Sequence, residues 1–496
     1  MIGIVTRRRA GRIAVGRPAQ GMKGMVAWLG WIGAIVGLTA GITACATLSG
    51  VGVTVAAERP HVYIVLIDGL DSRRLSETLT PTLWKLGTGP GGRGAFYREG
   101  RAVMPTVTNT NHVSIMTGAY AEAHGVVNNA FWAEAVPRRG MTSERADLLQ
   151  VETLFTVAER TRPKLVTAAL FGKTRLVPLF TASASQRAPD ILWGDPDTPT
   201  EPIDRNRGFA SDRRTMDKAL EVIATSDPDL LFVGLPDVDR TSHVFGPDSH
   251  RARTAMLEAD RQVDRLIRAL KRSGAWEDTV LMITADHGFA DVSPDAAAGR
   301  PYPMITLGSV MEAQGLAGVG LLGIGGLESV VIVGATPDAL TSDQHRTLAE
   351  VRRHALEHSG VQAAWYRNDN PHDGGAEHTI RRARPSWRID HPRTGALVLV
   401  GRPGYHFVDP FRPWAASFLG MHGGPDAQTV PILVTGGHPR LRAERVIPGE
   451  GTPPAANPDL GTTTAWLLDL REPRALTGKR VPERSRGRIL REAFRD

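Results

Sequence analysis

The sequence contains one cysteine, Cys45, among 496 residues. A single thiol excludes an internal disulfide framework. The composition is otherwise that of a globular protein, with 42% hydrophobic and 22% charged residues. The length suits one large α/β domain with insertions, or two domains.

Acidic residues are absent from the first 57 positions, which hold six basic side chains. Once these six are set aside, the formal net charge of +7 falls to +1 for the remainder. The body is therefore not a basic nucleic-acid-binding domain, and no binding to a nucleic-acid duplex is expected. Residues 471–496 are basic again, and they form either a solvated end or a contact with anionic lipid.

A long apolar run follows the first basic residues, from Met25 through Ala57. A basic segment followed by an apolar one is typical of a secretory signal. The stretch from Leu38 to Cys45 resembles a bacterial lipoprotein signal, in which small residues precede the cysteine. Cleavage near residues 55–57 and retention as a membrane anchor are the alternatives, since the run is long enough to span a bilayer. Each alternative places the body outside the cytoplasm, secreted or anchored in the cell envelope.

Several apolar, β-rich runs end in polar residues, which is typical of buried parallel strands. Between two of them, apolar residues recur at helical spacing from Met256 to Leu270. Strands alternating with such helices predict a doubly wound, mostly parallel α/β sheet, whose ligands bind outside the carboxyl ends of the strands. The run 430–435 is expected to be an edge strand, because Pro431 cannot donate to a ladder. The four expected parallel strands are 61–67, 164–170, 229–235 and 279–285.

Hydroxyl and amide side chains gather between Met104 and Gly118, just before a short apolar helical pattern. A hydroxyl at a helix start lies near unpaired backbone N–H groups and the positive end of the helix dipole. Such a position suits a nucleophile or a phosphate. An ordinary helix cap is the alternative interpretation of the same residues.

Carboxylates and imidazoles recur where strands are expected to end. Together they offer three carboxylates and three imidazoles, a mixture that suits zinc because zinc accepts nitrogen and oxygen ligands. Asp239 and His243 are four residues apart and face one centre if the segment is helical. The full set is Asp68, Asp239, His243, Asp286, His287 and His422.

These motifs resemble the alkaline phosphatase superfamily, and most of all its nucleotide pyrophosphatase/type I phosphodiesterase branch. The resemblance runs from His61 to about Glu483. It implies an alkaline phosphatase-like catalytic domain over 58–299 and 406–485. Residues 300–405 are rich in Gly and Pro and break the pattern of strands and helices, so we expect them to form an inserted α+β cap. Residues 1–57 are the signal or anchor, and 486–496 are a basic tail. The motifs are Ile67–Gly69, Thr108 through Asn129, Asp239 with His243, Ala285–Gly288 and Gly420–Gly423.

The resemblance also implies roles for individual residues. Two metal ions, Zn²⁺ in preference to Mn²⁺ or Mg²⁺, would bind near Thr108, the nucleophile of an in-line displacement through a phospho-threonine intermediate. Asn129 would hydrogen-bond a phosphoryl oxygen. The family commonly has Phe-Pro after the nucleophile, whereas this sequence has Asn109-Thr110 after Thr108. Thr106 and Thr110 therefore remain alternative attackers. One metal would be held by Asp239, His243 and His422, and the other by Asp68, Asp286, His287 and Thr108.

The expected substrate is a small phosphate diester or nucleotide. Lys173 and Arg175 follow an expected strand and resemble a cation pair found in related monoesterases and phosphonoacetate hydrolases. If they point inward, a phosphomonoester or phosphonate becomes the alternative substrate; otherwise they belong to a surface loop. A non-catalytic envelope binding protein is the alternative from another class. A sulfatase is disfavoured, because sulfatase chemistry needs a modified residue that Cys45, which lies in the targeting segment, cannot supply.

Overall fold

The computed structural model describes residues 5–6, 59–132, 140–196, 208–290, 304–316, 318–408, 417–449 and 451–495. All of them belong to one compact unit, formed by residues 58–496 and 1–6. Cys45 and the expected signal or anchor, except residues 5–6, lie outside the described residues, so those expectations stay predictions. None of the described helices combines the length and apolar character needed to cross a membrane.

The longest apolar run of the body forms the central strand of a large sheet. Strand β2 (His61–Ile67) is buried from Val62 onward and runs parallel to both of its neighbours, β8 and β9. The strand order is β1-β7-β6-β8-β2-β9-β16-β3. The other parallel strands are β6 (Thr167–Phe171), β7 (Ile191–Trp193), β8 (Leu230–Leu235) and β9 (Thr279–Thr284). Short β1 (Val5–Thr6) joins β7 in antiparallel pairing.

The expected edge strand lies inside the sheet. Strand β16 (Thr429–Gly436) pairs antiparallel with β9 on one side and with β3 (Ala95–Arg101) on the other. The prediction of an edge position for residues 430–435 is therefore wrong. The pairing with β3 shifts register between Val430 and Ile432, so Pro431 falls in an irregularity where its missing N–H is not needed.

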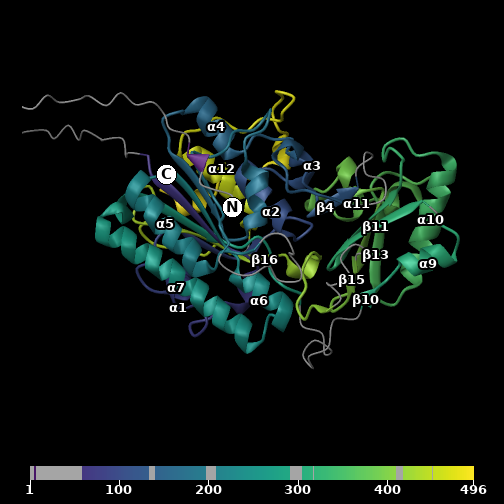
Figure 1. Cartoon of the computed structure of the whole chain (residues 1–496), viewed down its shortest axis with the longest axis horizontal. Helices are drawn as coiled ribbons and strands as arrows, with labels where there is room; N and C mark the ends of the chain where they lie inside the picture. Colours follow the sequence, from purple (N-terminus) through teal and green to yellow (C-terminus); the bar gives the residue numbers. More distant parts are fainter. Residues whose placement is uncertain are drawn as a thin grey trace, which may run out of the picture. The chain divides into compact units, whose positions relative to one another are not determined.

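Helices cover both faces of this sheet (Figure 1). Helix α7 (His250–Ser273) begins where the Ser249 side chain accepts a hydrogen bond from the Ala252 N–H, and it packs against α1, α5 and α6. Helix α2 (Thr108–Thr117) packs against α12 (Asn457–Leu467) on the opposite face. All ten residues of α2 are buried despite their polar character, which fixes the position of its first residue. The remaining bounds are α1 (Pro81–Thr88), α5 (Asp212–Ser226) and α6 (Asp237–Phe245).

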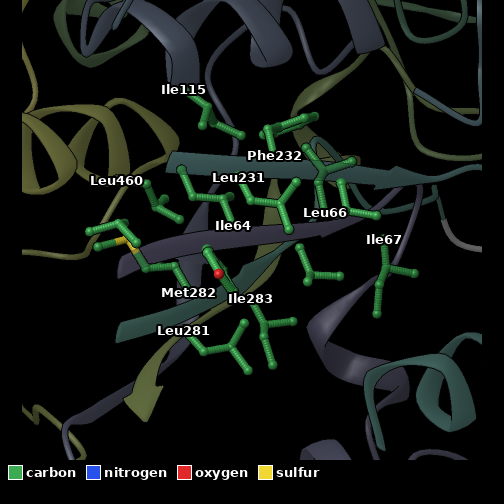
Figure 2. Packing of buried hydrophobic residues seen from close by; sticks show 14 of the residues in the cluster. Ile64, Leu66, Ile67, Ile115, Leu231, Phe232, Leu281, Met282, Ile283 and Leu460 are labelled. Atoms are coloured by element: carbon green, nitrogen blue, oxygen red, sulfur yellow. The ribbon is translucent and has the colours of Figure 1, made fainter. Parts of the chain in front are cut away.

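The main core lies between the sheet and these helices. Figure 2 shows side chains of β2, β8 and β9 packed with Ile115 of α2 and Leu460 of α12. Most of these side chains have no exposed surface. Burial of such apolar side chains stabilises the folded chain by about 1.5–3 kcal/mol each. The labelled strand residues are Ile64, Leu66, Ile67, Leu231, Phe232, Leu281, Met282 and Ile283.

A second sheet, green in Figure 1, is inserted between β9 and β16. Its strand order is β11-β12-β14-β13, all pairs are antiparallel, and α10 (Ser342–Glu357) packs on β13. It has its own apolar core, which includes Leu348 and Leu397. The strands are β11 (Val319–Ile324), β12 (Leu327–Ile332), β13 (Val361–Tyr366) and β14 (Leu397–Gly401). The doubly wound sheet with an inserted α+β cap is thus confirmed, whereas the exact domain boundaries stay predictions.

Candidate active site

Three neighbouring strands deliver carboxylates to one edge of the sheet. Asp68 directly follows β2, Asp286 comes two residues after β9, and Asp239 lies in the first turn of α6, just beyond β8. All three side chains are buried. Parallel strands end at the same edge, so acids far apart in the sequence meet there.

Asp239 faces two imidazoles. Its Oδ1 lies 3.3 Å from His243 Nε2 and 3.7 Å from His422 Nε2, and the two nitrogens are 3.2 Å apart. Each ring places Nδ1 2.8 Å from a backbone carbonyl, that of Gly420 for His243 and that of Thr106 for His422. These Nδ1 atoms therefore carry the protons, and both Nε2 atoms present lone pairs. Two lone pairs beside a carboxylate oxygen fit a cation.

His287 links this group to the other two carboxylates. Its Nε2 lies 3.5 Å from Asp286 Oδ2, 3.6 Å from Asp68 Oδ1 and 3.9 Å from Asp239 Oδ1. Its Nδ1 is 3.0 Å from the Gly288 carbonyl, so Nε2 again presents the lone pair. All three of these carboxylate oxygens are buried and have no hydrogen-bond partner among the described residues. Buried anionic oxygens without partners are costly unless a cation binds them.

The pKa shifts of the cluster residues are consistent with a site that binds a cation. Burial raises the pKa of Asp68 to about 6, against the lowering effect of Lys173. Burial and then the charge of Asp68 raise the pKa of Asp286 well above its ordinary value. Burial lowers the pKa of His287 to about 3 and that of His422 well below its ordinary value. The His287 and His422 rings are therefore neutral, as metal ligands must be, and burial disfavours the charged forms of Asp68 and Asp286.

The structure thus brings together all six predicted carboxylate and imidazole groups. Asp239, His287 and His422 offer ligand atoms within 4.8 Å of one another, and Asp68, His112 and Asp286 form a second such group. The first group combines residues that the sequence assigned to different metals. Which ligand belongs to which ion therefore stays a prediction.

His112 was missed by the sequence reasoning. Its Nδ1 lies 2.9 Å from the Thr108 carbonyl and 3.6 Å from Asp286 Oδ2. At 2.9 Å from a carbonyl this atom carries a proton, so it donates a hydrogen bond and is not a ligand. Burial lowers the pKa of His112 to about 3, which keeps the ring neutral. The Asn111-His112 pair in the α2 segment was the available signal.

Thr108 lies at the centre of this arrangement. It is the first residue of α2, and Val107 occupies the cap position, so the alternative of an ordinary Thr cap does not apply to Thr108. Its Oγ1 is 3.4 Å from His287 Nε2 and accepts a hydrogen bond from Lys173 Nζ at 3.2 Å. Asn129 Oδ1 accepts the Asn109 N–H at 2.9 Å, which leaves the Asn129 amide N–H₂ for a ligand.

The two alternative hydroxyls have different surroundings. Thr106 Oγ1 donates to the Gly424 carbonyl at 2.7 Å and accepts from the Gly423 N–H at 3.0 Å. This hydroxyl is therefore occupied in holding the His422 loop. Thr110 Oγ1 is buried and has no hydrogen-bond partner within the part of the chain that the structure describes.

The two predicted substrate cations are placed differently. Lys173 Nζ is buried and lies 2.7 Å from Asp68 Oδ2 and 2.8 Å from Asp239 Oδ2. Burial alone would lower the pKa of Lys173, but the charges of Asp239 and Asp68 raise it above its ordinary value, so the ammonium stays charged. Arg175 donates to Glu144 Oε1 at 2.9 Å. Lys173 is thus inside the cluster, and Arg175 is held beside it by an acidic partner.

The fold and this cluster are those of an alkaline phosphatase-like α/β protein. Within that class, the chain belongs to the type I phosphodiesterase / nucleotide pyrophosphatase family, whose model matches residues 62–425. The resemblance stated from the sequence is confirmed.

Curated relatives match part of the chain. A venom phosphodiesterase of Naja atra is 25% identical over 261 residues, which are 50% of this chain and 28% of the relative. The bis(5'-adenosyl)-triphosphatase ENPP4 of Bos taurus is 25% identical over 251 residues, 48% of this chain and 50% of the relative. The chain therefore matches half or less of the length of these two relatives.

Solved structures support the fold over a larger share of the chain. An inactive murine ectonucleotide pyrophosphatase / phosphodiesterase 5 in complex with AMP superposes with a TM-score of 0.59 at 18% identity. The match covers 83% of this chain and 96% of that one. The human protein of the same name gives a TM-score of 0.60 at 18% identity, over 83% of this chain and 95% of that one.

Proposed function

We propose that this protein is a metal-dependent hydrolase of phosphoryl esters that acts through a phospho-threonine at Thr108. The observation that carries the proposal is the position of Thr108 Oγ1. It lies 3.4 Å from His287 Nε2 and 3.2 Å from Lys173 Nζ, beside buried carboxylate oxygens that have no hydrogen-bond partner among the described residues. A hydroxyl in such surroundings is suited to act as a nucleophile.

The chain's own ligands fit a pair of divalent cations. Asp239, His243 and His422 would hold one ion, and Asp68, Asp286 and His287 the other. The mixture of nitrogen and oxygen donors favours Zn²⁺ over Mn²⁺ or Mg²⁺. When bound, such a pair supplies the positive charge that favours the Thr108 alkoxide and neutralises the departing oxygen.

The protein's own side chains supply the nucleophile and position the transferring group. The Thr108 hydroxyl loses its proton to solvent, and its Oγ1 forms a bond to phosphorus while the bond to the leaving oxygen breaks. The leaving oxygen takes a proton from water. Water then attacks the phospho-threonine and releases phosphate or a phosphomonoester. Lys173 donates to Thr108 Oγ1, and the Asn129 amide N–H₂ donates to an oxygen of the transferring group.

A phosphate diester or a nucleotide pyrophosphate is the proposed substrate class. It is supported by the family and by curated relatives described as a phosphodiesterase and as a bis(5'-adenosyl)-triphosphatase. We also propose an extracytoplasmic location, secreted or envelope-anchored, on the basis of the basic and apolar N-terminal sequence.

Purified protein beginning at Glu58 is expected to hydrolyse bis-p-nitrophenyl phosphate in the presence of zinc. Mono-p-nitrophenyl phosphate, measured in parallel, reports the alternative monoesterase activity. The release of p-nitrophenol and the metal content should be determined on the same sample. Bound metal without turnover of either ester would instead support the non-catalytic binding protein.

The position of Lys173 favours phosphomonoesters or phosphonates as a second candidate substrate class. A monoester brings a dianionic phosphoryl group, and the buried ammonium lies within hydrogen-bond distance of the proposed nucleophile. Arg175 is the neighbouring cation on the same turn, although Glu144 accepts one of its N–H groups. A second cation near the phosphoryl group stabilises the additional negative charge of a monoester.

Replacing Lys173 and Arg175 together by Ala is expected to lower monoester kcat/KM at least about 10-fold more than diester kcat/KM. The reason is that the monoester has one more charge for the two cations to neutralise. The two p-nitrophenyl substrates give both values. Lys218→Ala serves as the control, since its ammonium pairs with Glu221 on the surface. Equal losses on both substrates would assign the two cations to the stability of the cluster and not to substrate choice.

A further inference from the structure

The cap contacts the cluster through the turn of its first hairpin. Strands β11 and β12 are joined by two residues, Gly325 and Gly326, because Ile324 pairs with Leu327. Gly325 has a φ of +61°, which is typical of the first central position of a two-residue hairpin turn. Gly326 does not adopt the left-handed conformation, so turn geometry does not explain why it lacks a side chain.

The explanation lies in the loop that carries His422. The Gly326 N–H donates to the His422 carbonyl at 3.2 Å. A Cβ on Gly325 would lie 1.5 Å from that same carbonyl oxygen, and a Cβ on Gly326 would lie 2.8 Å from Gly424 Cα. The turn therefore packs directly on the backbone of the loop, and neither position leaves room for a side chain.

The catalytic body holds the same loop from its other side. The Thr106 carbonyl accepts from His422 Nδ1 at 2.8 Å, and the Thr106 hydroxyl accepts from the Gly423 N–H at 3.0 Å. The body thus fixes the imidazole ring, whereas the cap fixes the main chain of the same residue. With both contacts made, His422 Nε2 points at Asp239 Oδ1 from 3.7 Å.

We infer that the Gly325–Gly326 turn of the cap positions His422 for metal binding, so that docking of the cap hairpin and metal binding are coupled. The inference rests on the proposed role of His422 as a metal ligand. A ligand whose backbone can shift binds more weakly, because the site must be ordered at the moment of binding. Coupling is reciprocal, so a bound metal must also stabilise the docked hairpin.

Gly325→Ala tests the inference against a matched control, Gly334→Ala. Gly334 has a φ of +78° in the same cap, and no described atom lies within 4 Å of the position its Cβ would take. Both variants strain the backbone, but only the first displaces the His422 carbonyl. Zinc affinity should be measured by competition with a chromogenic chelator. We expect it to fall at least about 10-fold in Gly325→Ala relative to Gly334→Ala, as for other groups that orient metal ligands.

Equal zinc affinities of the two variants would overturn the inference. A wild type that binds zinc but hydrolyses no phosphate ester would defeat the proposed function and leave this comparison valid. If Gly325→Ala does not fold, hydrogen exchange of the wild type decides. Zinc should slow exchange in peptides covering residues 319–332 and leave those covering α10 unchanged. The same change in both regions, or none in either, would also overturn it.

Discussion

Thr108→Ala is expected to lose activity at least about 10²-fold while it retains its metal ions, as removal of a nucleophile usually does. The Thr108 hydroxyl lies in the cluster beside Lys173 Nζ and His287 Nε2, but the carboxylates and imidazoles can bind metal without it. The steady-state rate on bis-p-nitrophenyl phosphate and the metal content of the same preparation check both parts. Thr108→Ser should keep measurable activity, because it preserves the hydroxyl.

Two further variants identify the attacking group. Thr110→Val removes a buried hydroxyl that has no hydrogen-bond partner among the described residues, and it should leave the rate within a few-fold of wild type. Mass spectrometry of acid-quenched enzyme should find the phosphoryl group on the peptide that contains residue 108. Near wild-type turnover by Thr108→Ala would exclude Thr108 as the nucleophile. Thr110 would then be the candidate, since the Thr106 hydroxyl already hydrogen-bonds with the backbone of Gly423 and Gly424.

The part of the site that the sequence predicts best comes from strand ends. Asp68 and Asp286 follow continuous apolar runs, and such runs mark buried parallel strands whatever surrounds them. Asp239 and His243 are also predictable, because four residues separate them on a helix. The convergence of these groups follows from parallel strand topology alone.

Other features depend on long-range packing and could not be predicted in this way. Pro431 suggested an edge strand, because a local rule does not reveal a register shift against a strand more than 300 residues away in the sequence. His112 Nδ1 lies 3.6 Å from Asp286 Oδ2, and no periodicity in the sequence predicts that these two residues are neighbours. The need for glycine at both positions of the cap turn is explained only by its close contact with the loop that carries His422.

Asp239→Asn is expected to cause the largest loss, because this carboxylate is shared by the whole cluster. Its Oδ1 faces the Nε2 atoms of His243, His422 and His287 at 3.3, 3.7 and 3.9 Å, and its Oδ2 accepts from Lys173 at 2.8 Å. Although burial raises the pKa of Asp239, the charge of Lys173 lowers it well below its ordinary value. The group is therefore an anion at every pH at which the enzyme would be assayed.

Removing that negative charge leaves the facing imidazoles without an anionic co-ligand. Metal content is expected to fall by at least one ion per chain. A bound cation contributes several kcal/mol of transition-state stabilisation, which corresponds to a rate loss of about 10³-fold. Chelation of the wild type should produce the same loss, and added zinc should reverse it in the wild type but not in Asp239→Asn.

Asp237→Asn is the matched control for this prediction. It makes the same change two residues earlier on α6, where the carboxylate accepts hydrogen bonds from Arg240 and from the Asp212 N–H. This variant should keep the wild-type metal content and rate. If Asp239→Asn retained both ions and full activity, Asp239 would not be a metal ligand, and its Oδ1, which has no hydrogen-bond partner among the described residues, would need another explanation.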